Sequence, residues 1–423
     1  MSKRFHILLT VASAALLSTQ AFAQDLFIQD ATVVTSDGQR ADTDILIRDG
    51  AITQIGSNLA APEGMDVFDG KGQWVTPGLF ASFSNLGLVD VAAEATTNDI
   101  SASGADTSVS ERAADSFNPR NASIANTKRR GVTMAVVSPS PSGDSIFAGT
   151  GLIATTSGQF NSVVKENAFV HVALGETGAS RAGGSRSAAM AQLRGALDDA
   201  KGYPNRYRSP TDGDALSRQD AAALAPVVRG EIPLIVSANR ASDLLGIIRL
   251  KQDYPALDII ILGAAEAWQV AEALAQADMK VILDPVQDLP AQFEDLGARY
   301  ENVLLLDKAG VDYAIMNLTS YRVTKPAALG QHAGNAVGNG LSWDKAFKAI
   351  TSTPERWFNL PSQEIKTGPL TSLVIWDGDP LEATSAPVKL WIDGKEQSLE
   401  SRQSMLRDRY NPLNKSDMPH KYR

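Results

Sequence analysis

The sequence predicts an α/β fold: a (β/α)8 TIM-like barrel joined to a small β-sandwich built from both chain ends. First, apolar runs typical of buried parallel strands alternate with helical segments from residue 77 to residue 360. Second, this stretch is close to the usual barrel size of about 250 residues. Third, short alternating strands with Asp-Gly turns occur near both chain ends. An open doubly wound sheet is the alternative, but no G-x-G-x-x-G follows the first strand.

Residues 1–23 have the three parts of a secretory signal peptide. Lys3 and Arg4 are followed by an apolar run, and Ala21 and Ala23 frame an A-x-A cleavage site. The run is too short to span a bilayer comfortably, although an uncleaved anchor is the alternative. We therefore expect cleavage after Ala23 and a mature chain that is periplasmic or secreted, with no transmembrane segment.

The composition excludes several kinds of binding partner and several kinds of catalytic or metal-binding chemistry. The chain is 43% hydrophobic and 21% charged, as in an ordinary globular protein. Its net charge of −9 argues against nucleic acid and against an anionic membrane surface. It contains no cysteine, which excludes disulfides, thiolate metal ligands and a cysteine nucleophile.

The two chain ends, residues 24–76 and 361–423, are predicted to form one β unit. Asp49-Gly50 lies between two alternating runs and indicates a tight hairpin. The same alternation returns at residues 371–383 and 388–399.

The barrel is expected within residues 77–360, beginning at Pro77-Gly78. Beyond the first strand, strands are predicted at residues 131–140, 166–175, 232–240, 257–266, 279–285, 300–310 and 311–318. Helices are predicted at residues 187–203, 241–254, 266–278 and 342–354. Ser342 is expected to cap the last helix, and Ser242 or Asp243 the helix at 241–254.

Three stretches have the composition of loops. Residues 92–128 and 203–214 are rich in turn-forming residues and either cover the active face or are solvated insertions. The Gly- and Ser-rich run 140–152 offers backbone N–H groups to an anion, or is a loop that packs against the barrel mouth.

Five segments together resemble the imidazolonepropionase-like branch of the amidohydrolase superfamily, over nearly the whole mature chain. They are "DGKGQWVTPGLFASF", "LGETGASRAGGSR", "IPLIVSANRASDL", "AGNAVGNGLSWDKAFKAITSTPERWF" and "SLVIWDGDPLEATSAPVKLWIDG". The resemblance implies a barrel with a composite β-sandwich. It also implies a divalent metal, usually zinc, that acidifies a bound water at the barrel mouth.

This sequence departs from that family at the metal ligands. The resemblance implies two histidines at i and i+2 on the first strand, both facing inward, where the chain has Phe83 and Asn85. It implies further ligands on three later strands, where the chain has Ser237 and Asn239, Gly263, and Asn317 or Leu318. Glu266 is retained after Gly263, and Asp312 lies on the wrong part of its strand. We therefore expect no bound metal and no other cofactor.

The histidine count supports that expectation independently. His6 is in the signal peptide and His420 in the tail, which leaves His171 and His332. A single histidine on an apolar strand is more often a satisfied core residue than a ligand, so we favour structural roles for both.

Other polar residues near the carboxyl ends of the strands offer only weak catalytic candidates. The set comprises Ser82, Ser84, Asn85, Glu176, Arg181, Arg186, Ser237, Asn239, Arg240, Glu266 and Asp284. No G-x-S-x-G elbow occurs, and no histidine is well placed as a base for a serine. Glu176 and Glu266 form a possible acid–base pair, but ion pairs with Arg186 or Arg240 are the favoured reading. Asp284, before Pro285, is expected to cap a turn.

Three functions remain open. The first is a non-catalytic partner or scaffold that has lost the metal site and associates with an active homologue or with itself. The second is a hydrolase of carbon–nitrogen bonds other than peptide bonds, using a rearranged or metal-free site. The third is a binding protein that holds a small molecule in the old pocket.

Overall fold

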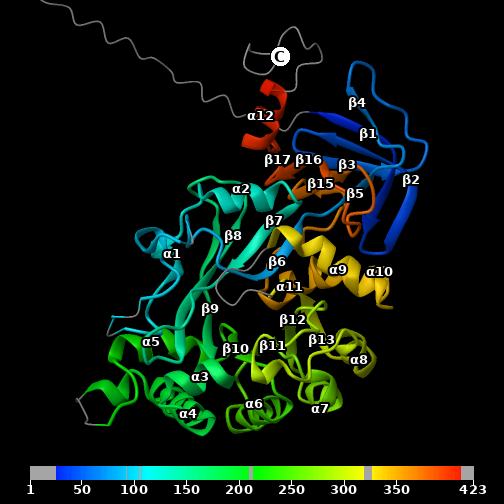
Figure 1. Cartoon of the computed structure of the whole chain (residues 1–423). Coiled ribbons are helices and arrows are strands. Elements are labelled where there is room, and N and C mark those ends of the chain that lie inside the picture. The colour runs from blue at the N-terminus through cyan, green and yellow to red at the C-terminus, as the bar shows by residue number, and fades with distance from the viewer. Residues whose placement is uncertain are drawn as a thin grey trace, which may run out of the picture.

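The structure, a computed structural model, describes residues 25–91, 93–102, 104–105, 107–208, 213–318 and 326–410. The predicted signal peptide, His6 and His420 lie outside these residues. Two sheets organise the chain, and helices α3 to α8 lie around the outside of the eight-stranded one (Figure 1). In the part of the chain so described, no helix has the length and apolar character needed to cross a bilayer.

Strands from both chain ends form the nine-stranded sheet, named here the end-strand sheet. β5 from the N-terminal part pairs antiparallel with β15 from the C-terminal part, and this pairing joins the two ends as predicted. A separate apolar core belongs to this sheet. Its strands are β1 (Leu26–Thr35), β2 (Gly38–Arg48), β3 (Ala51–Gly56), β4 (Asp66–Asp69), β5 (Trp74–Thr76), β14 (Gly368–Pro369), β15 (Ser372–Trp376), β16 (Pro387–Ile392) and β17 (Lys395–Glu396). The order is β14-β3-β2-β1-β5-β15-β16-β17, with β4 beside β1.

The hairpin predicted at Asp49-Gly50 joins β2 to β3. Both turn residues have positive φ, 51° and 73°, and Arg48 pairs with Ala51 across the turn. A two-residue turn with positive φ at both positions matches the twist of antiparallel strands, which is why Asp-Gly is favoured there.

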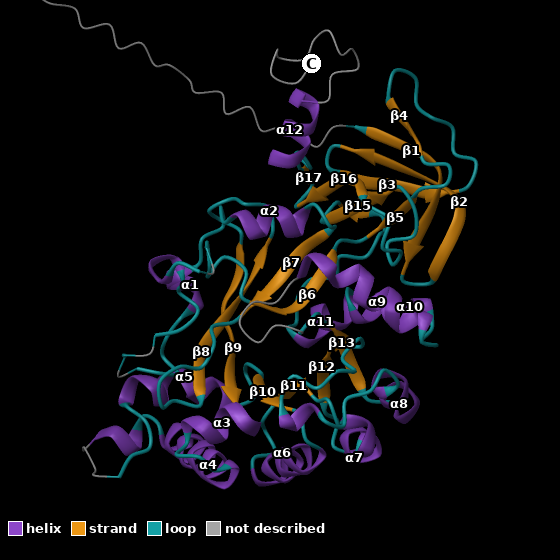
Figure 2. Ribbon diagram, in the orientation of Figure 1, coloured by secondary structure: helices purple, strands orange, loops and turns teal. Residues whose placement is uncertain are grey.

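The eight-stranded sheet is the predicted barrel. Its eight strands follow one another in space from β6 to β13 in chain order (Figure 2). Strands β9 to β13 are parallel, as β/α alternation requires. The strands are β6 (Leu79–Ser84), β7 (Val132–Val137), β8 (Phe147–Thr155), β9 (Val163–Ala173), β10 (Leu234–Ala238), β11 (Ile259–Gly263), β12 (Lys280–Leu283) and β13 (Asp312–Ile315).

β8 is a departure from the predicted alternation. It runs antiparallel to both neighbours and includes residues 147–152, which were expected to be a loop. Its glycines explain the wrong prediction, because they suggest a turn but serve close packing. A Cβ on Gly151 would lie 1.9 Å from the Phe169 ring, and one on Gly149 would lie 2.5 Å from the Glu111 carbonyl oxygen.

Most predicted helices are present, and one predicted strand is wrong. Residues 300–310 contain α8, which returns the chain from β12 to the start of the parallel strand β13. Ser342 caps α10 as predicted. The helices are α1 (Ala113–Ser116), α2 (Ala122–Lys128), α3 (Gly175–Arg181), α4 (Arg186–Gly202), α5 (Arg218–Val228), α6 (Ala241–Asp253), α7 (Ala271–Gln276), α8 (Asn302–Ala309), α9 (Leu329–Gly338), α10 (Trp343–Ala349), α11 (Ser352–Trp357) and α12 (Arg402–Tyr410).

The start of α6 differs from the expected cap. Arg240, and neither Ser242 nor Asp243, is the N-cap residue, and its side chain makes no capping bond. Instead the N–H of Ala241 donates to Glu266 Oε2 at 2.9 Å. A carboxylate from the neighbouring βα loop therefore satisfies an N–H that the helix itself leaves unpaired.

Candidate functional site

The candidate site is the barrel mouth, where the carboxyl ends of the strands meet. Phe83 and Asn85, at the end of β6, are both buried. The Phe83 ring meets the His171 imidazole edge-on, with 5.2 Å between ring centroids. β7 and β8 lie between β6 and β9, so a contact from Phe83 to His171 runs through the barrel interior. Asn85 Nδ2 donates to the Ser138 carbonyl oxygen at 2.8 Å.

His171 uses both ring nitrogens inside the protein. Nε2 lies 2.8 Å from Ser237 Oγ, and Nδ1 lies 3.1 Å from Ser138 Oγ and 3.3 Å from the Pro139 carbonyl oxygen. Burial lowers the pKa of His171 to about 4, so the imidazole is neutral at pH 7. The hydroxyl of Ser237 therefore serves this hydrogen-bonded bridge between β7, β9 and β10.

A second buried chain of hydrogen bonds connects β12, β13 and α9. His332 Nδ1 donates to Asp284 Oδ1 at 2.8 Å, and Asn317 Nδ2 donates to His332 Nε2 at 2.9 Å. The N–H groups of Val286 and Leu318 also donate to Asp284. Asp284 thus caps a turn as predicted, and it also orients His332, a contact that the sequence does not reveal.

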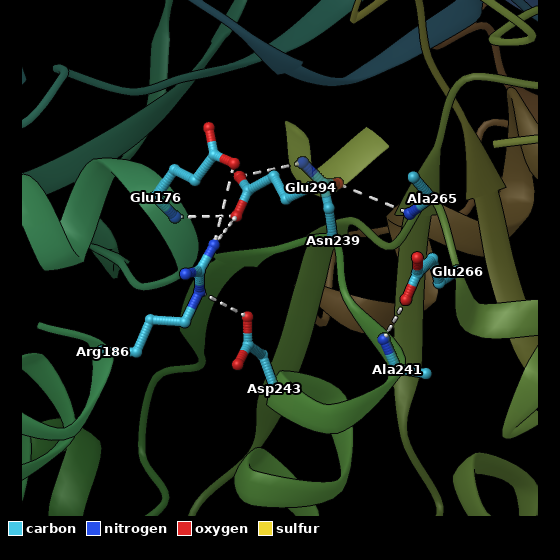
Figure 3. Close-up of polar contacts among 8 residues, drawn as sticks. All are labelled: Glu176, Arg186, Asn239, Ala241, Asp243, Ala265, Glu266 and Glu294. Carbon is cyan, nitrogen blue, oxygen red and sulfur yellow. Dashed lines mark hydrogen bonds and ion pairs between the residues drawn. The ribbon is translucent and has the colours of Figure 1, made fainter. Parts of the chain in front are cut away.

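The side chain of Asn239 occupies the space next to Gly263. Asn239 Nδ2 donates to Glu294 Oε1 at 3.2 Å, and Asn239 Oδ1 accepts from the N–H of Ala265 at 3.4 Å (Figure 3). Gly263 has φ of +102°, and a Cβ there would lie 2.4 Å from Asn239 Oδ1. A side chain at 263 would require both a strained backbone and a shift of the Asn239 amide.

Charged side chains gather at one edge of the mouth, around Arg186. Its Nη2 lies 3.5 Å from Glu294 Oε2 and 3.8 Å from Glu176 Oε1, and its Nε donates to Asp243 at 3.2 Å. Figure 3 shows the guanidinium between these carboxylates. The N–H of Glu176 donates to Glu294 at 2.7 Å. Three carboxylates thus share one arginine.

Glu294 is the member of this cluster that sequence reasoning missed. It lies in the loop between β12 and α8, and its side chain is 5% exposed. Burial raises its pKa above the usual range, against the N–H of Glu176 and the amide of Asn239, which lower it. The text "AQFEDLG" has no periodicity or spacing that marks a buried carboxylate, so only the fold reveals it.

The remaining weak candidates are not brought together. Glu176 belongs to the Arg186 cluster, whereas Glu266 binds the start of α6, so no contact supports the Glu176–Glu266 pair. Arg181 donates to the Gly143 carbonyl oxygen. On β6, Ser82 is fully buried and Ser84 donates to the Val136 carbonyl oxygen. At the far end of β13, Asp312 is bound by Arg356.

The residues at the mouth do not fit the zinc ion that the resemblance implies. Zinc takes imidazole, thiolate or carboxylate ligands at about 2 Å in a tetrahedral arrangement. Over the described residues, no three His, Cys, Asp or Glu side chains are grouped so that they could hold a metal ion. His171 and His332 are in separate hydrogen-bonded chains, and neither ring nitrogen of either is directed at the other.

Comparison with known proteins supports the fold. No protein-family profile matches this chain. The chain is 22% identical over 403 residues to the amidohydrolase tasK of Hapsidospora irregularis, covering 84% of this chain and 40% of tasK. A segment is 45% identical over 56 residues to a dihydroorotase from Citrifermentans bemidjiense, or 13% of each chain. The chain therefore spans less than half the length of either curated relative.

The similarity to solved structures covers a far larger part of the other chains. An amidohydrolase from Thermotoga maritima superposes with a TM-score of 0.76 at 23% identity, over 88% of this chain and 99% of that one. A prolidase bound to N-methylphosphonate-L-proline has a TM-score of 0.55 at 13% identity, over 88% and 99%. At these identities the structures establish the fold alone. By its barrel and its composite end-strand sheet, the chain has the fold of these amidohydrolases, and its sequence is similar to that of tasK.

Proposed function

We propose that this protein is a non-catalytic amidohydrolase-fold partner or scaffold protein that acts outside the cytoplasm. One observation carries the proposal. At the family's ligand positions the chain places Phe83, Asn85, Ser237, Asn239 and Gly263, and the polar ones are hydrogen-bonded within the protein. A buried group that is already satisfied gains nothing by binding a metal, and Gly263 has no side chain to serve as a ligand. The export and the partner role rest on the sequence expectations above.

Metal analysis of the purified mature chain tests the loss of the metal site. We expect below about 0.1 equivalent of zinc, manganese or iron per chain by mass spectrometry of the metals, because too few ligands converge. Dialysis against zinc should not raise that value, and hydantoins, acyl-amino acids and dipeptides should not be turned over. One equivalent of metal together with turnover that a chelator abolishes would overturn the proposal.

The same assay tests an alternative, a metal-free hydrolase of carbon–nitrogen bonds. The observation that favours it is Glu294, a buried carboxyl with a raised pKa beside Glu176 and Arg186. A raised pKa is what a general acid requires. Turnover that survives chelator and is lost in Glu294→Gln would support this alternative.

A third function, the binding of a small molecule in the old pocket, has less support because Phe83, Asn85, Asn239 and Asn317 are buried.

An apolar surface beside the mouth supports the partner role. Loop 285–301 is anchored inside by Glu294 and Asp295, which are buried, and several of its other side chains are exposed. Four of these are exposed and apolar or aromatic: Leu289 (83%), Phe293 (84%), Leu296 (68%) and Tyr300 (42%). Exposed apolar residues scattered singly are normal, but four on one loop indicate an interaction surface.

The same chain carries a complementary surface on α12. This helix buries no residue and exposes Met405, Leu406 and Tyr410. It carries three arginines against Asp408, whereas the carboxylates that loop 285–301 exposes are Asp288 and Glu301, against Arg299. α12 and α8, which follows the loop, lie at opposite ends of the molecule in Figure 1. The occupant that fits loop 285–301 is therefore α12 of a second copy, in a head-to-tail contact.

The double substitution Phe293→Ser and Leu296→Ser is expected to abolish this self-association. The molar mass by light scattering should rise with concentration in the unmodified chain and stay at the monomer value in the variant, because the apolar contact is lost. Phe160→Ser is the matched control, since Phe160 is 76% exposed on another part of the surface. A monomeric mass for the unmodified chain at every concentration would contradict self-association.

A further inference from the structure

A cavity lies at the junction between the end-strand sheet and the barrel, away from the mouth. It has a volume of about 590 Å³. The turn between β1 and β2 forms one side of it, and helices α10 and α11 form the other. Pro77, which precedes the first barrel strand, also lines it, which places the cavity toward the amino ends of the strands. Its volume is within the range of small-molecule sites, about 300–1,000 Å³.

Aromatic side chains form part of the cavity wall. Trp343 and Phe347 both line it, and their rings stack with centroids 4.8 Å apart and planes at 14°. Trp74 packs against Trp343 from the end-strand sheet, with ring centroids 5.3 Å apart. The indole N–H of Trp343 donates to the Asp379 carboxylate at 2.9 Å. These contacts hold the indole ring in one orientation.

Glu355 lines the same cavity, and its carboxylate makes few polar contacts with the protein around it. The residue is 5% exposed. Its carboxylate accepts one hydrogen bond, from the N–H of Gln363 to Oε2 at 3.3 Å. Oε1 has no hydrogen-bond partner, and no cation lies within 4.0 Å of the carboxylate, among the residues that the structure describes. Removing a carboxylate from water without a cationic partner is costly, so its position at a cavity calls for a partner.

The charges around the cavity favour a cation as that partner. Asp344, Glu355 and Glu364 line it, as do Lys348 and Arg356. Arg356 is already bound to Asp312 at 2.7 Å, and Glu364 lies 3.8 Å from Lys366. An exposed lysine is then the one free cation against two free carboxylates among the cavity-lining residues described here. The electrostatic balance inside is therefore negative.

We propose that this cavity binds a small organic ammonium, with Glu355 as the counter-ion and Trp343 and Phe347 as the apolar wall. A carboxylate next to a tryptophan face is the usual protein arrangement for a cationic nitrogen, because the ring quadrupole attracts the charge. This site is independent of the partner role proposed above and of any metal at the mouth.

The protonation state of Glu355 should control the affinity of the cavity for an ammonium ligand. Burial is the main cause that raises the pKa of Glu355 to about 7, with Glu364 acting in the same direction and Lys366 in the opposite one. Glu355 is therefore ionised at pH 8 and protonated at pH 5. An ammonium ligand, which stays charged over this range, should bind more tightly at the higher pH.

Calorimetric titration of the full chain with benzylammonium tests the proposal, with benzyl alcohol as its neutral counterpart. We expect binding of benzylammonium at pH 8, at least tenfold weaker binding at pH 5, and no detectable heat with benzyl alcohol. Glu355→Gln should weaken the binding at pH 8 at least tenfold. The control Glu364→Gln, at the more exposed rim, should change it less than threefold.

Several outcomes would overturn the proposal. They are no binding of benzylammonium to the unmodified chain at pH 8, equal affinities for the ammonium and the alcohol, or equal affinities of the unmodified chain and Glu355→Gln. Because the pH dependence is measured on the unmodified chain, the test does not depend on any variant folding. Metal content and turnover do not enter it, so its result is separate from that of the proposed function.

Discussion

Glu355→Gln is expected to raise the free energy of unfolding by about 3 kcal/mol at pH 8 and to leave it nearly unchanged at pH 4. In the folded chain, burial raises the pKa of this carboxyl from 4.5 to about 7. Below pH 4.5 the group is protonated in both folded and unfolded states, and the folded state keeps its full stability. As the pH rises through 7, the unfolded state ionises freely while the folded state must ionise a buried group. The unmodified chain therefore loses stability over this window, and glutamine does not titrate.

Urea unfolding at pH 4, 6 and 8 measures this difference. The difference in stability between the variant and the unmodified chain is more informative than the pH profile of either one alone. The reason is that His171 changes the stability with pH in the opposite direction. Its pKa is lowered to about 4, so its contribution is lost as the pH falls from 6.5 toward 4. Glu364→Gln, next to Lys366, should shift stability by less than about 1 kcal/mol at each pH. An equal effect of Glu355→Gln at pH 4 and pH 8 would show that Glu355 does not titrate as stated.

Gly263→Ala is expected to destabilise the protein by about 3 kcal/mol or more. Two independent costs add. A φ of +102° is a conformation that L side chains rarely adopt, and the new Cβ would lie 2.4 Å from Asn239 Oδ1. Asn239 cannot move freely, because it is hydrogen-bonded to Glu294 and Ala265. A histidine at this position would incur the same costs, so a family-type ligand cannot be restored there by a single substitution.

The matched control is Gly338→Ala at the end of α9. A Cβ at Gly338 meets nothing within 4 Å, so the substitution should change stability by less than about 1 kcal/mol. Thermal unfolding of the two variants at one pH makes the comparison. A loss for Gly263→Ala no larger than that for Gly338→Ala would mean that the backbone at the mouth relaxes more readily than the contacts indicate.

The sequence predicts much of the architecture because local patterns encode it. Asp49-Gly50 requires a turn with positive φ, Ser342 supplies a hydroxyl to a helix start, and apolar runs predict the strands that carry Phe83 and Ser237. The same patterns gave wrong predictions where one kind of residue occurs in two kinds of structure. Glycines in 147–152 pack closely within β8, and the apolar run at 302–309 is a helix because a parallel connection requires one.

The site depended on contacts between distant segments. The sequence identifies which residues stand at the family's ligand positions, but not that Asn239 and Gly263 are matched, or that Asp284 binds His332 across 48 residues. It offers Glu176 and Glu266 as a weak acid–base pair and favours ion pairs with Arg186 or Arg240; the fold places Glu176 beside Arg186 and adds Glu294, which the sequence does not reveal.

The sequence alone therefore determined most of the secondary structure, the composite architecture and which residue types stand at the family's ligand positions, since each depends on residue type and local spacing. Only the tertiary structure decided which carboxyl groups are buried and what faces them. Glu294 and Glu355 look like ordinary surface residues in the text of the sequence. Their raised pKa values come from desolvation by segments remote in the chain, and desolvation is a property of the packed molecule.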